Sequence, residues 1–191
     1  CRVWSFSAVL GIRPTCARPP ETGGVSLLLD PCLDCGAGTP PTTRLCLEWL
    51  DAHVIEGKSV VDYGCGSGIL GVAAAKLGAK SVIAIDIDPQ ALLATRSNAE
   101  RNDVSNLITT GLPRELDDDE RFDVVLANIL AGPLVELAPI ICQALRPGGI
   151  IALSGILQEQ ASAVREAYSA YCDMDEPVIE GDWIRLSGKR H

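Results

Sequence analysis

The residues that most clearly indicate a chemical function lie in a glycine-rich stretch, Asp62–Gly68, with the sequence DYGCGSG. Its alternate glycines, Gly64, Gly66 and Gly68, let the backbone turn tightly and approach a ligand without a Cβ in the way. The helix expected after this turn offers unpaired N–H groups to a carboxylate or phosphate. Asp62 adds an anion that suits an ammonium group. S-adenosylmethionine carries an amino and a carboxylate group, so the stretch favours this cofactor.

The same glycines leave a dinucleotide-binding interpretation open. Gly66–Gly71 satisfies the pattern G-x-G-x-x-G, and Asp86 lies about 20 residues further on, as such sites require. The first glycine of that pattern should follow the strand directly, whereas Gly64 and Cys65 intervene here. Counted from Gly64 the pattern fails, because Ile69 occupies the place of the third glycine. A nicotinamide or flavin enzyme, or a tight turn without a ligand, therefore remains as an alternative.

Two further polar residues follow predicted strands. Asp86 ends a strand over residues 81–86, where a carboxylate can accept hydrogen bonds from both hydroxyls of a ribose. Asp88 is instead assigned to capping the next helix. Asn128 follows the strand Phe122–Ala127, and its side-chain carbonyl can accept a hydrogen bond from an attacking amine and aim the nitrogen lone pair. An ordinary turn residue is the alternative for both Asp86 and Asn128.

The elements that must position these residues alternate between strands and helices from residue 59 to residue 170. The predicted strands cover residues 59–63, 81–86, 107–110, 122–127, 150–154, 177–180 and 183–188, and the predicted helices 41–53, 70–77, 89–102, 133–145 and 159–170. This order predicts an α/β fold, a Rossmann-like doubly wound, mostly parallel sheet with helices on both faces and an antiparallel C-terminal strand. Ligands of such sheets bind at the carboxyl ends of the strands, where the polar residues fall.

Composition excludes several classes of protein. The 191 residues include 16 Lys and Arg against 25 Asp and Glu, a net charge of -9, so no direct nucleic-acid binding is expected and a basic partner is favoured. No run approaches the ~18 apolar residues of a membrane span. The eight cysteines are predicted to be reduced thiols of a cytoplasmic protein. Cys32 and Cys35 form a CxxC pair, but a second ligand pair is lacking and no metal site is predicted.

Four stretches together resemble the bacterial ribosomal protein L-eleven methyltransferases, the PrmA family. They are residues 62–68, 85–89, 98–102 and 128–133, and the last, Asn-Ile-Leu-Ala-Gly-Pro, is far more selective than the glycine loop. The resemblance extends over roughly residues 25–190. It implies a seven-stranded sheet, S-adenosylmethionine as the cofactor, and cofactor contacts at Thr43, Gly64, Asp86 and Asn128. For Thr43, an ordinary place in the first turn of a helix is the alternative.

Departures from the family pattern bear on the domain organisation. Pro40 stands where the family has histidine, Ala37 occupies the second position of the same loop, and residues 1–24 match poorly. Residues 1–40 are rich in proline and glycine and are expected to be irregular, apart from a short strand at 25–29. They are interpreted as the remnant of a linker after an absent substrate-recognition domain. Residues 41–191 are interpreted as the methyltransferase domain.

The resemblance implies a protein N-methyltransferase that modifies lysine and α-amino groups of a large-subunit ribosomal protein. The attacking amine must be neutral, and deprotonating a lysine with a pKa near 10.4 costs about 4–5 kcal/mol at neutral pH. A dry pocket that disfavours ammonium supplies part of this. Asn128 is then the predicted catalytic residue, which orients the amine rather than acting as a base. A class I methyltransferase for another protein or a small amine, and a cofactor-binding chain without activity, remain as alternatives; no oligomeric state is predicted.

Overall fold

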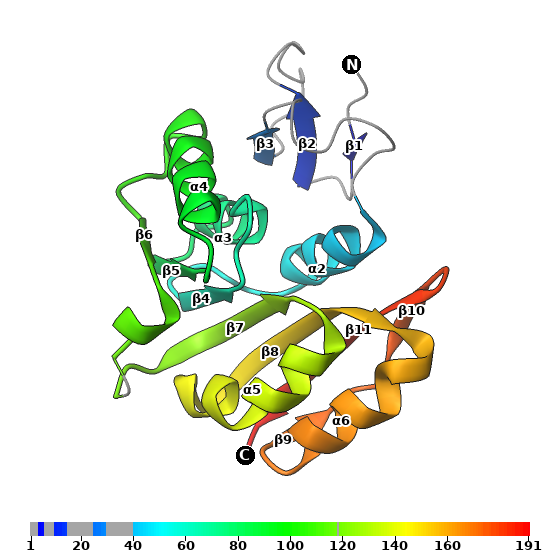
Figure 1. The fold of residues 1–191 in the computed structure, drawn as a ribbon. Coiled ribbons are helices and arrows are strands. Elements are labelled where there is room, and N and C mark those ends of the chain that lie inside the picture. Colours follow the sequence, from blue (N-terminus) through cyan, green and yellow to red (C-terminus); the bar gives the residue numbers. More distant parts are fainter. Residues whose placement is uncertain (1–3, 6–9, 15–24, 30–39, 118) are drawn as a thin grey trace.

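The computed structural model describes residues 4–5, 10–14, 25–29, 40–117 and 119–191 (Figure 1). The strands of its main sheet are β4 (Ser59–Tyr63), β5 (Ser81–Ile85), β6 (Ile108–Gly111), β7 (Phe122–Asn128), β8 (Leu145–Leu157), β9 (Cys172–Met174), β10 (Val178–Glu180) and β11 (Trp183–Arg190). The helices are α2 (Pro41–Ala52), α3 (Ile69–Lys76), α4 (Pro89–Arg101), α5 (Ala131–Ala144) and α6 (Ala161–Ser169), with 3-10 turns η1 (Pro113–Glu115) and η2 (Gln158–Gln160).

The main sheet has the strand order β10-β11-β8-β7-β4-β5-β6, and β9 pairs with β11 as an eighth strand. The pairings of β4 with β5 and β7, of β5 with β6, and of β7 with β8 are parallel. Strand β11 runs antiparallel to β8, β9 and β10. The predicted α/β fold with a mostly parallel sheet and an antiparallel C-terminal strand is confirmed. The three-residue β9 was not predicted and makes the sheet one strand larger than expected.

Helices cover both faces of this sheet, because its central strands are apolar on both sides. Val60 of β4 packs in one core with α2 and α3, whereas its neighbour Val61 packs in a second core with α5 and α6. Figure 1 shows α2, α3 and α4 on one side of the sheet and α5 and α6 on the other. None of the helices in the described ranges is long and apolar enough to cross a membrane.

The residues between the predicted helix 133–145 and the predicted strand 150–154 belong to a strand rather than to a turn. The sequence Pro147-Gly148-Gly149 belongs to β8, which begins at Leu145. Phe122 of β7 pairs with Leu145 and Val124 pairs with Ile150, so the intervening residues of β8 form a bulge opposite a single residue of β7. Gly148 has a φ of 76°, which a bulge accommodates. Proline followed by two glycines is typical of a turn, but pairing on both sides of the bulge keeps these residues in the sheet.

The segment before residue 40 is more regular than the sequence predicts. Strands β1 (Trp4–Ser5), β2 (Leu10–Pro14) and β3 (Val25–Leu29) form a separate three-stranded sheet. The predicted strand at 25–29 is confirmed, and the irregular character expected for the rest is corrected at β1 and β2. Strand β1 has only two residues, and β2 contains Gly11 and ends at Pro14, so neither shows the apolar pattern that is typical of a strand. Leu27 of β3 is fully buried in the core that contains α3.

Four cysteines within residues 40–117 and 119–191 are buried and free: Cys46, Cys65, Cys142 and Cys172. The CxxC pair formed by Cys32 and Cys35 lies outside the described residues.

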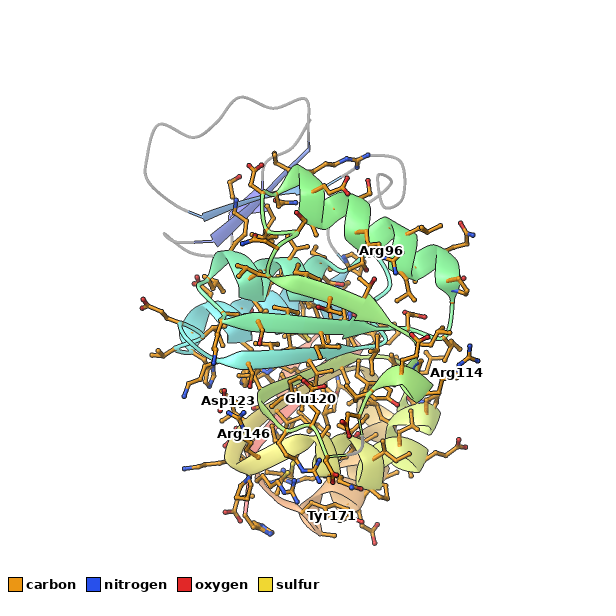
Figure 2. All side chains as sticks on the ribbon, turned by 90° about the vertical axis from the view of Figure 1, so that its left-hand side faces the viewer. Arg96, Arg114, Glu120, Asp123, Arg146 and Tyr171 are labelled. Carbon is orange, nitrogen blue, oxygen red and sulfur yellow. The ribbon has the colours of Figure 1, made fainter. Side chains whose placement is uncertain are left out.

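A polar contact fixes the amino ends of β4 and β7. The carboxylate of Asp123 accepts hydrogen bonds from Ser59 N (2.8 Å) and Ser59 Oγ (2.9 Å). Arg146 Nη1 lies 2.8 Å from the other oxygen of Asp123, and Figure 2 shows these two side chains together at one end of the sheet. Partial burial raises the pKa of Asp123, but the hydrogen bonds from Ser59 and Arg146 outweigh this and hold its pKa below the ordinary value. The opposite ends of β4 and β7 carry the candidate site.

This contact predicts a specific loss of stability in acid. A carboxyl group with a depressed pKa in the folded state contributes its full stabilisation above its pKa in the unfolded state, ~3.9. This contribution is lost as the pH falls through the pKa of the folded state. Between about pH 5 and pH 2.5 the free energy of unfolding should therefore fall less in Asp123→Asn than in the wild type. We expect a difference of about 1 kcal/mol, because Arg146 and Asp123 are partly solvated. Urea denaturation at several pH values measures it.

The control for this experiment is Asp119→Asn, which makes the same chemical change at an exposed position. It should follow the wild-type pH profile. If Asp123→Asn also follows that profile, the carboxylate does not stabilise the fold.

Candidate functional site

The candidate site lies where three adjacent strands end at one level. The last residue of β4, Tyr63, pairs both with the last residue of β5 and with Ala127 of β7. The next residues therefore lie side by side: Gly64 and Asp86 directly follow β4 and β5, and Asn128, predicted to follow its strand, is instead the last residue of β7. All three were predicted from the sequence, and the register of the parallel strands brings them together.

The glycine loop makes the tight turn that the sequence predicts. Gly64, Gly66 and Gly68 have φ angles of 75°, 53° and 74°, values that side chains disfavour. The N–H groups of Gly64 and Cys65 both donate to the carbonyl of the last residue of β5, at 2.8 and 3.0 Å. A Cβ on Gly64 would lie 2.2 Å from Ile129 Cγ2, whereas a Cβ on Gly66 would meet no atom within 4 Å. The loop is therefore packed on one side at Gly64 and open at Gly66.

Asp86 connects this loop to the end of β5. One carboxylate oxygen accepts from Gly66 N at 2.9 Å and the other from Asp88 N at 3.0 Å. Each oxygen keeps a further lone pair, so the half-buried carboxylate can still accept hydrogen bonds from two hydroxyl groups. Asp88 accepts from Gln90 N at 2.9 Å and begins α4, which confirms the predicted helix cap.

Ile87 is a candidate ligand contact that the sequence analysis missed. Its side chain is 85% exposed although it lies between Asp86 and Asp88. A large apolar side chain beside a hydroxyl-binding carboxylate offers a surface for the flat face of a base. The signal was present in the sequence, because an apolar residue between two acids directly after a strand has no place in the core.

Asp62 occupies the inner side of the loop. Its carboxylate is 1% exposed and accepts from Gly71 N of α3 at 2.9 Å. Burial raises the pKa of Asp62 to about 7, the Gly71 N–H opposes this, and the neighbouring charge of Asp86 adds to it. Asp62 thus joins the end of β4 to the start of α3. The expected contact between Asp62 and a ligand ammonium stays a prediction.

Asn128 and Thr43 are 85 residues apart in the chain and form a hydrogen bond, with Asn128 Nδ2 donating to Thr43 Oγ1 at 3.3 Å. Thr43 lies in the first turn of α2 and is 8% exposed. Because the amide NH₂ of Asn128 is directed at this hydroxyl, the side-chain carbonyl is the acceptor that remains for a ligand. The two predicted residues thus form one unit.

A cavity of about 330 Å³ adjoins Asn128. It is lined by Pro40, Pro41, Thr42, Asn128, Ile129, Leu130, Gly155 and Trp183. Most of its wall is apolar, and the amide of Asn128 is a polar group in it. A Cβ on Gly155 would lie 2.3 Å from the carbonyl oxygen of Ile129, so glycine permits this close approach of two chain segments.

Trp183 reaches the cavity because the hairpin of β10 and β11 is fixed to α2. Arg44 Nε of α2 donates to Glu180 Oε2 of β10 at 2.9 Å, and Arg185 Nη1 of β11 donates to Leu45 O at 3.1 Å. Neither Trp183 nor Gly155 was among the predicted site residues. Antiparallel pairing of β11 with β8 brings Trp183 to the cavity, and parallel pairing of β8 with β7, which sets Ser154 opposite Asn128, brings Gly155 there. Local sequence patterns reveal neither pairing.

The arrangement combines a site for a nucleoside with a place for a second reactant. The carboxylate of Asp86 and the exposed face of Ile87 suit a ribose and a base, and the open side of Gly66 admits a ligand close to the backbone. Beside them, Asn128 presents a carbonyl to an apolar cavity. Such a site can hold a nucleoside cofactor next to a nitrogen nucleophile.

Comparison with known proteins now assigns the chain to a family. The family model "Ribosomal protein L11 methyltransferase (PrmA)" matches residues 4–191. The chain belongs to this family. Ribosomal protein L11 methyltransferases of Shewanella sp. (strain ANA-3) and Aeromonas salmonicida (strain A449) are each 52% identical to it over 97% of its length. The chain spans 63% and 64% of these two relatives. Family membership decides against the dinucleotide oxidoreductase interpretation.

Solved structures agree with this assignment. The ribosomal protein L11 methylase of Lactobacillus delbrueckii subsp. bulgaricus matches all of the chain and 98% of its own length, with a TM-score of 0.84 and 31% identity. An RNA methyltransferase of Salinibacter ruber in complex with S-adenosyl-L-homocysteine matches 81% of the chain and 94% of its own, with a TM-score of 0.61. At 24% identity, the second likeness concerns the fold alone. The loop residues around Ala37, where the chain departs from the family pattern, lie outside the described residues.

The packing of Gly64 predicts different effects of the same substitution at two glycines. Gly64→Ala should lower the free energy of unfolding by about 2–5 kcal/mol, because a strained φ adds to a clash with Ile129. Gly66→Ala has the same backbone strain but open space, and should cost only about 1–2 kcal/mol. Chemical denaturation of the two variants measures the difference.

Removal of the clashing atoms provides the internal test. Adding Ile129→Ala to Gly64→Ala should restore part of the lost stability, measured relative to Ile129→Ala alone. Equal costs at both glycines, or no restoration, would contradict the close packing at Gly64.

Proposed function

We propose that the chain is the catalytic part of a methyltransferase that transfers methyl groups from S-adenosylmethionine to amino groups of ribosomal protein L11. Family membership and 52% identity to curated relatives of that name support the proposal. The observation that carries it is the alignment of Gly64, Asp86 and Asn128 at one level of the sheet, beside an apolar cavity. We assign the methyltransferase domain to residues 41–191.

The cofactor would be held by the glycine loop and the end of β5. The carboxylate of Asp86 would accept hydrogen bonds from the two ribose hydroxyls, and Ile87 would pack against the adenine. The open backbone at Gly66, with Gly64 and Gly68, admits the amino acid portion of the cofactor without a steric conflict. We also include in this proposal that Asp62 and Thr43 contact the cofactor. When bound, the cofactor supplies an electrophilic methyl group on a positively charged sulfur.

The acceptor amine would enter the cavity beside Asn128. The Asn128 carbonyl accepts a hydrogen bond from the neutral amine, which directs the nitrogen lone pair away from it and toward the cofactor. The apolar wall formed by Pro41, Ile129 and Trp183 disfavours an ammonium, so it lowers the pKa of an entering amine. None of the lining residues in the described ranges is an acid or a base. Catalysis would therefore rest on orientation and desolvation.

Lysine and α-amino groups are the proposed acceptors. An α-amine needs little help to lose its proton near neutral pH, whereas a lysine requires about 4–5 kcal/mol, part of which the apolar cavity would supply. The net charge of -9 is suited to a basic protein substrate rather than to nucleic acid. We propose the cytoplasm as the place of action.

One observation favours a second candidate function. Pro40 lines the cavity and stands where the family pattern has histidine. A chain that binds the cofactor but does not transfer methyl groups would be consistent with this difference. Binding and transfer must therefore be measured separately.

The first test is binding of S-adenosylmethionine and of NADH, each measured by calorimetry on the purified chain. We expect binding of S-adenosylmethionine only, and about 10- to 100-fold weaker binding in Asp86→Ala, because two hydrogen bonds to a charged group are lost. Asp173→Ala removes a 90% exposed carboxylate at the far edge of the sheet and should bind like the wild type. Binding of NADH alone would refute the methyltransferase proposal.

The second test is methyl transfer to isolated ribosomal protein L11 from S-adenosylmethionine with a labelled methyl group. The wild-type chain should transfer label, and Asn128→Ala should lose at least about 100-fold in rate, since a misplaced nucleophile costs roughly that much. A wild-type chain that binds the cofactor but transfers no label would favour the non-catalytic candidate. Mass spectrometry of the product identifies lysine and α-amino acceptors.

A further inference from the structure

Helix α4 has a buried polar face that the proposed chemistry does not use. Thr95 and Asn98 of α4, and Asn102, which caps the C-terminus of this helix, are spaced three and four residues apart, so they lie on one side of it. Their exposed fractions are 0%, 4% and 2%. Buried polar side chains are costly unless they are hydrogen-bonded, so their partners show what they hold.

The side chains of Thr95 and Asn98 donate hydrogen bonds to the glycine loop. Thr95 Oγ1 donates to Gly66 O at 3.2 Å, and Asn98 Nδ2 donates to Ser67 O at 2.9 Å. Thr95 also contacts Cys65, with 3.3 Å between Oγ1 and Sγ. Two successive carbonyls of the loop are thereby turned toward α4.

The third side chain joins the same helix to the N-terminal sheet. Asn102 Nδ2 donates to Leu28 O of β3 at 2.8 Å, and Asn102 Oδ1 accepts from Leu28 N at 2.8 Å. The amide thus pairs with the edge of β3 as a neighbouring strand would. The same Nδ2 donates to Asn98 O at 2.7 Å. A continuous series of hydrogen bonds runs from β3 through Asn102 and Asn98 to Ser67.

We propose that Thr95, Asn98 and Asn102 are positioning residues for the cofactor, which act by holding the glycine loop and by coupling it to the docking of β3. The inference rests on the proposed cofactor site. A carbonyl that turned into the loop's open side would repel the carboxylate of the cofactor and occupy its space. Donors from α4 prevent this rotation, and the contact between Asn102 and β3 keeps the donor of Asn98 in place.

The decisive variant is Asn98→Asp, because its effect depends on protonation. A protonated carboxyl can donate to Ser67 O, whereas a carboxylate cannot and is repelled by that carbonyl. Burial raises the pKa of the new carboxyl group, so it is protonated in mild acid. At pH 8 the dissociation constant of S-adenosylmethionine for Asn98→Asp should be about ten times the wild-type value. At pH 5 the ratio of the two constants should be within about twofold of one.

Neighbouring ionisable groups are the same in the variant and in the wild type, so the ratio of the two dissociation constants removes their contribution. Lys76 on α3, whose Nζ donates to Asn102 O at 3.3 Å, and the carboxyl groups of Asp62 and Asp86 are present in both proteins. Asn106→Asp makes the same change at an exposed position and should give a ratio near one throughout. A purely structural role of Asn98 would lower the melting temperature but leave the ratio near one for the folded protein, and that result would overturn the proposal.

A second pair of variants tests the proposal if Asn98→Asp does not fold. Thr95→Val keeps the shape but removes the donor to Gly66 O, and should weaken cofactor binding about 3- to 10-fold. Thr95→Ser keeps the donor and should bind within about twofold of the wild type. Equal affinities of these two variants would overturn the role of Thr95 as a positioning residue.

Asn102→Ala tests the coupling to β3. It should weaken cofactor binding although Asn102 does not border the open side of the loop, and its effect should not be additive with that of Asn98→Asp. Additive effects would overturn the coupling. A wild-type chain that binds no S-adenosylmethionine would instead refute the proposed function, so the two failures can be told apart.

Discussion

The in-register parallel pairing of β4 with β5 on one side and β7 on the other is the constraint on which the site depends. Because Tyr63 pairs with both Ile85 and Ala127, the residues that come next in the three strands meet without a long loop to bring them together. The contact between Ser59 and Asp123 fixes the opposite ends of β4 and β7. A shift of one strand by a single residue would separate Gly64 from Asn128 and turn core side chains outward.

Close packing then fixes the backbone at this edge. Gly64 lies against Ile129, and Gly155 lies against the carbonyl of the same residue, so the segment after β7 is held between the loop and β8. Asn98 and its neighbours on α4 hold the other side of the glycine loop. The glycine loop and the segment after β7 are thus closely packed, with the carboxylate of Asp86 next to the loop and the amide of Asn128 at the end of β7. Close packing of this kind suits a reaction whose rate depends on orientation.

Much of this could be predicted from the sequence, because apolar strands that end in glycine, aspartate or asparagine leave a local signal. The places of Asp86 and Asn128 at the ends of strands and the helix cap at Asp88 were predicted in this way. Contacts between distant segments leave no such signal, so the approach of Trp183 to the cavity and the β3 contact of Asn102 required the structure. Strands β1 and β9 escaped because two or three residues carry too little periodicity, and β2 escaped because it contains Gly11 and Pro14, which are uncommon in strands.

Backbone amide NMR during titration with S-adenosylhomocysteine, the product form of the proposed cofactor, tests the placement of the site most directly. We expect the largest chemical-shift changes at residues 64–68, 86–88 and 128–130, at the carboxyl ends of β4, β5 and β7. Asp123 and Arg146, at the opposite end of the sheet, should not shift (Figure 2). Changes centred on those two residues, or no saturable change anywhere in a folded chain, would contradict the placement of the site.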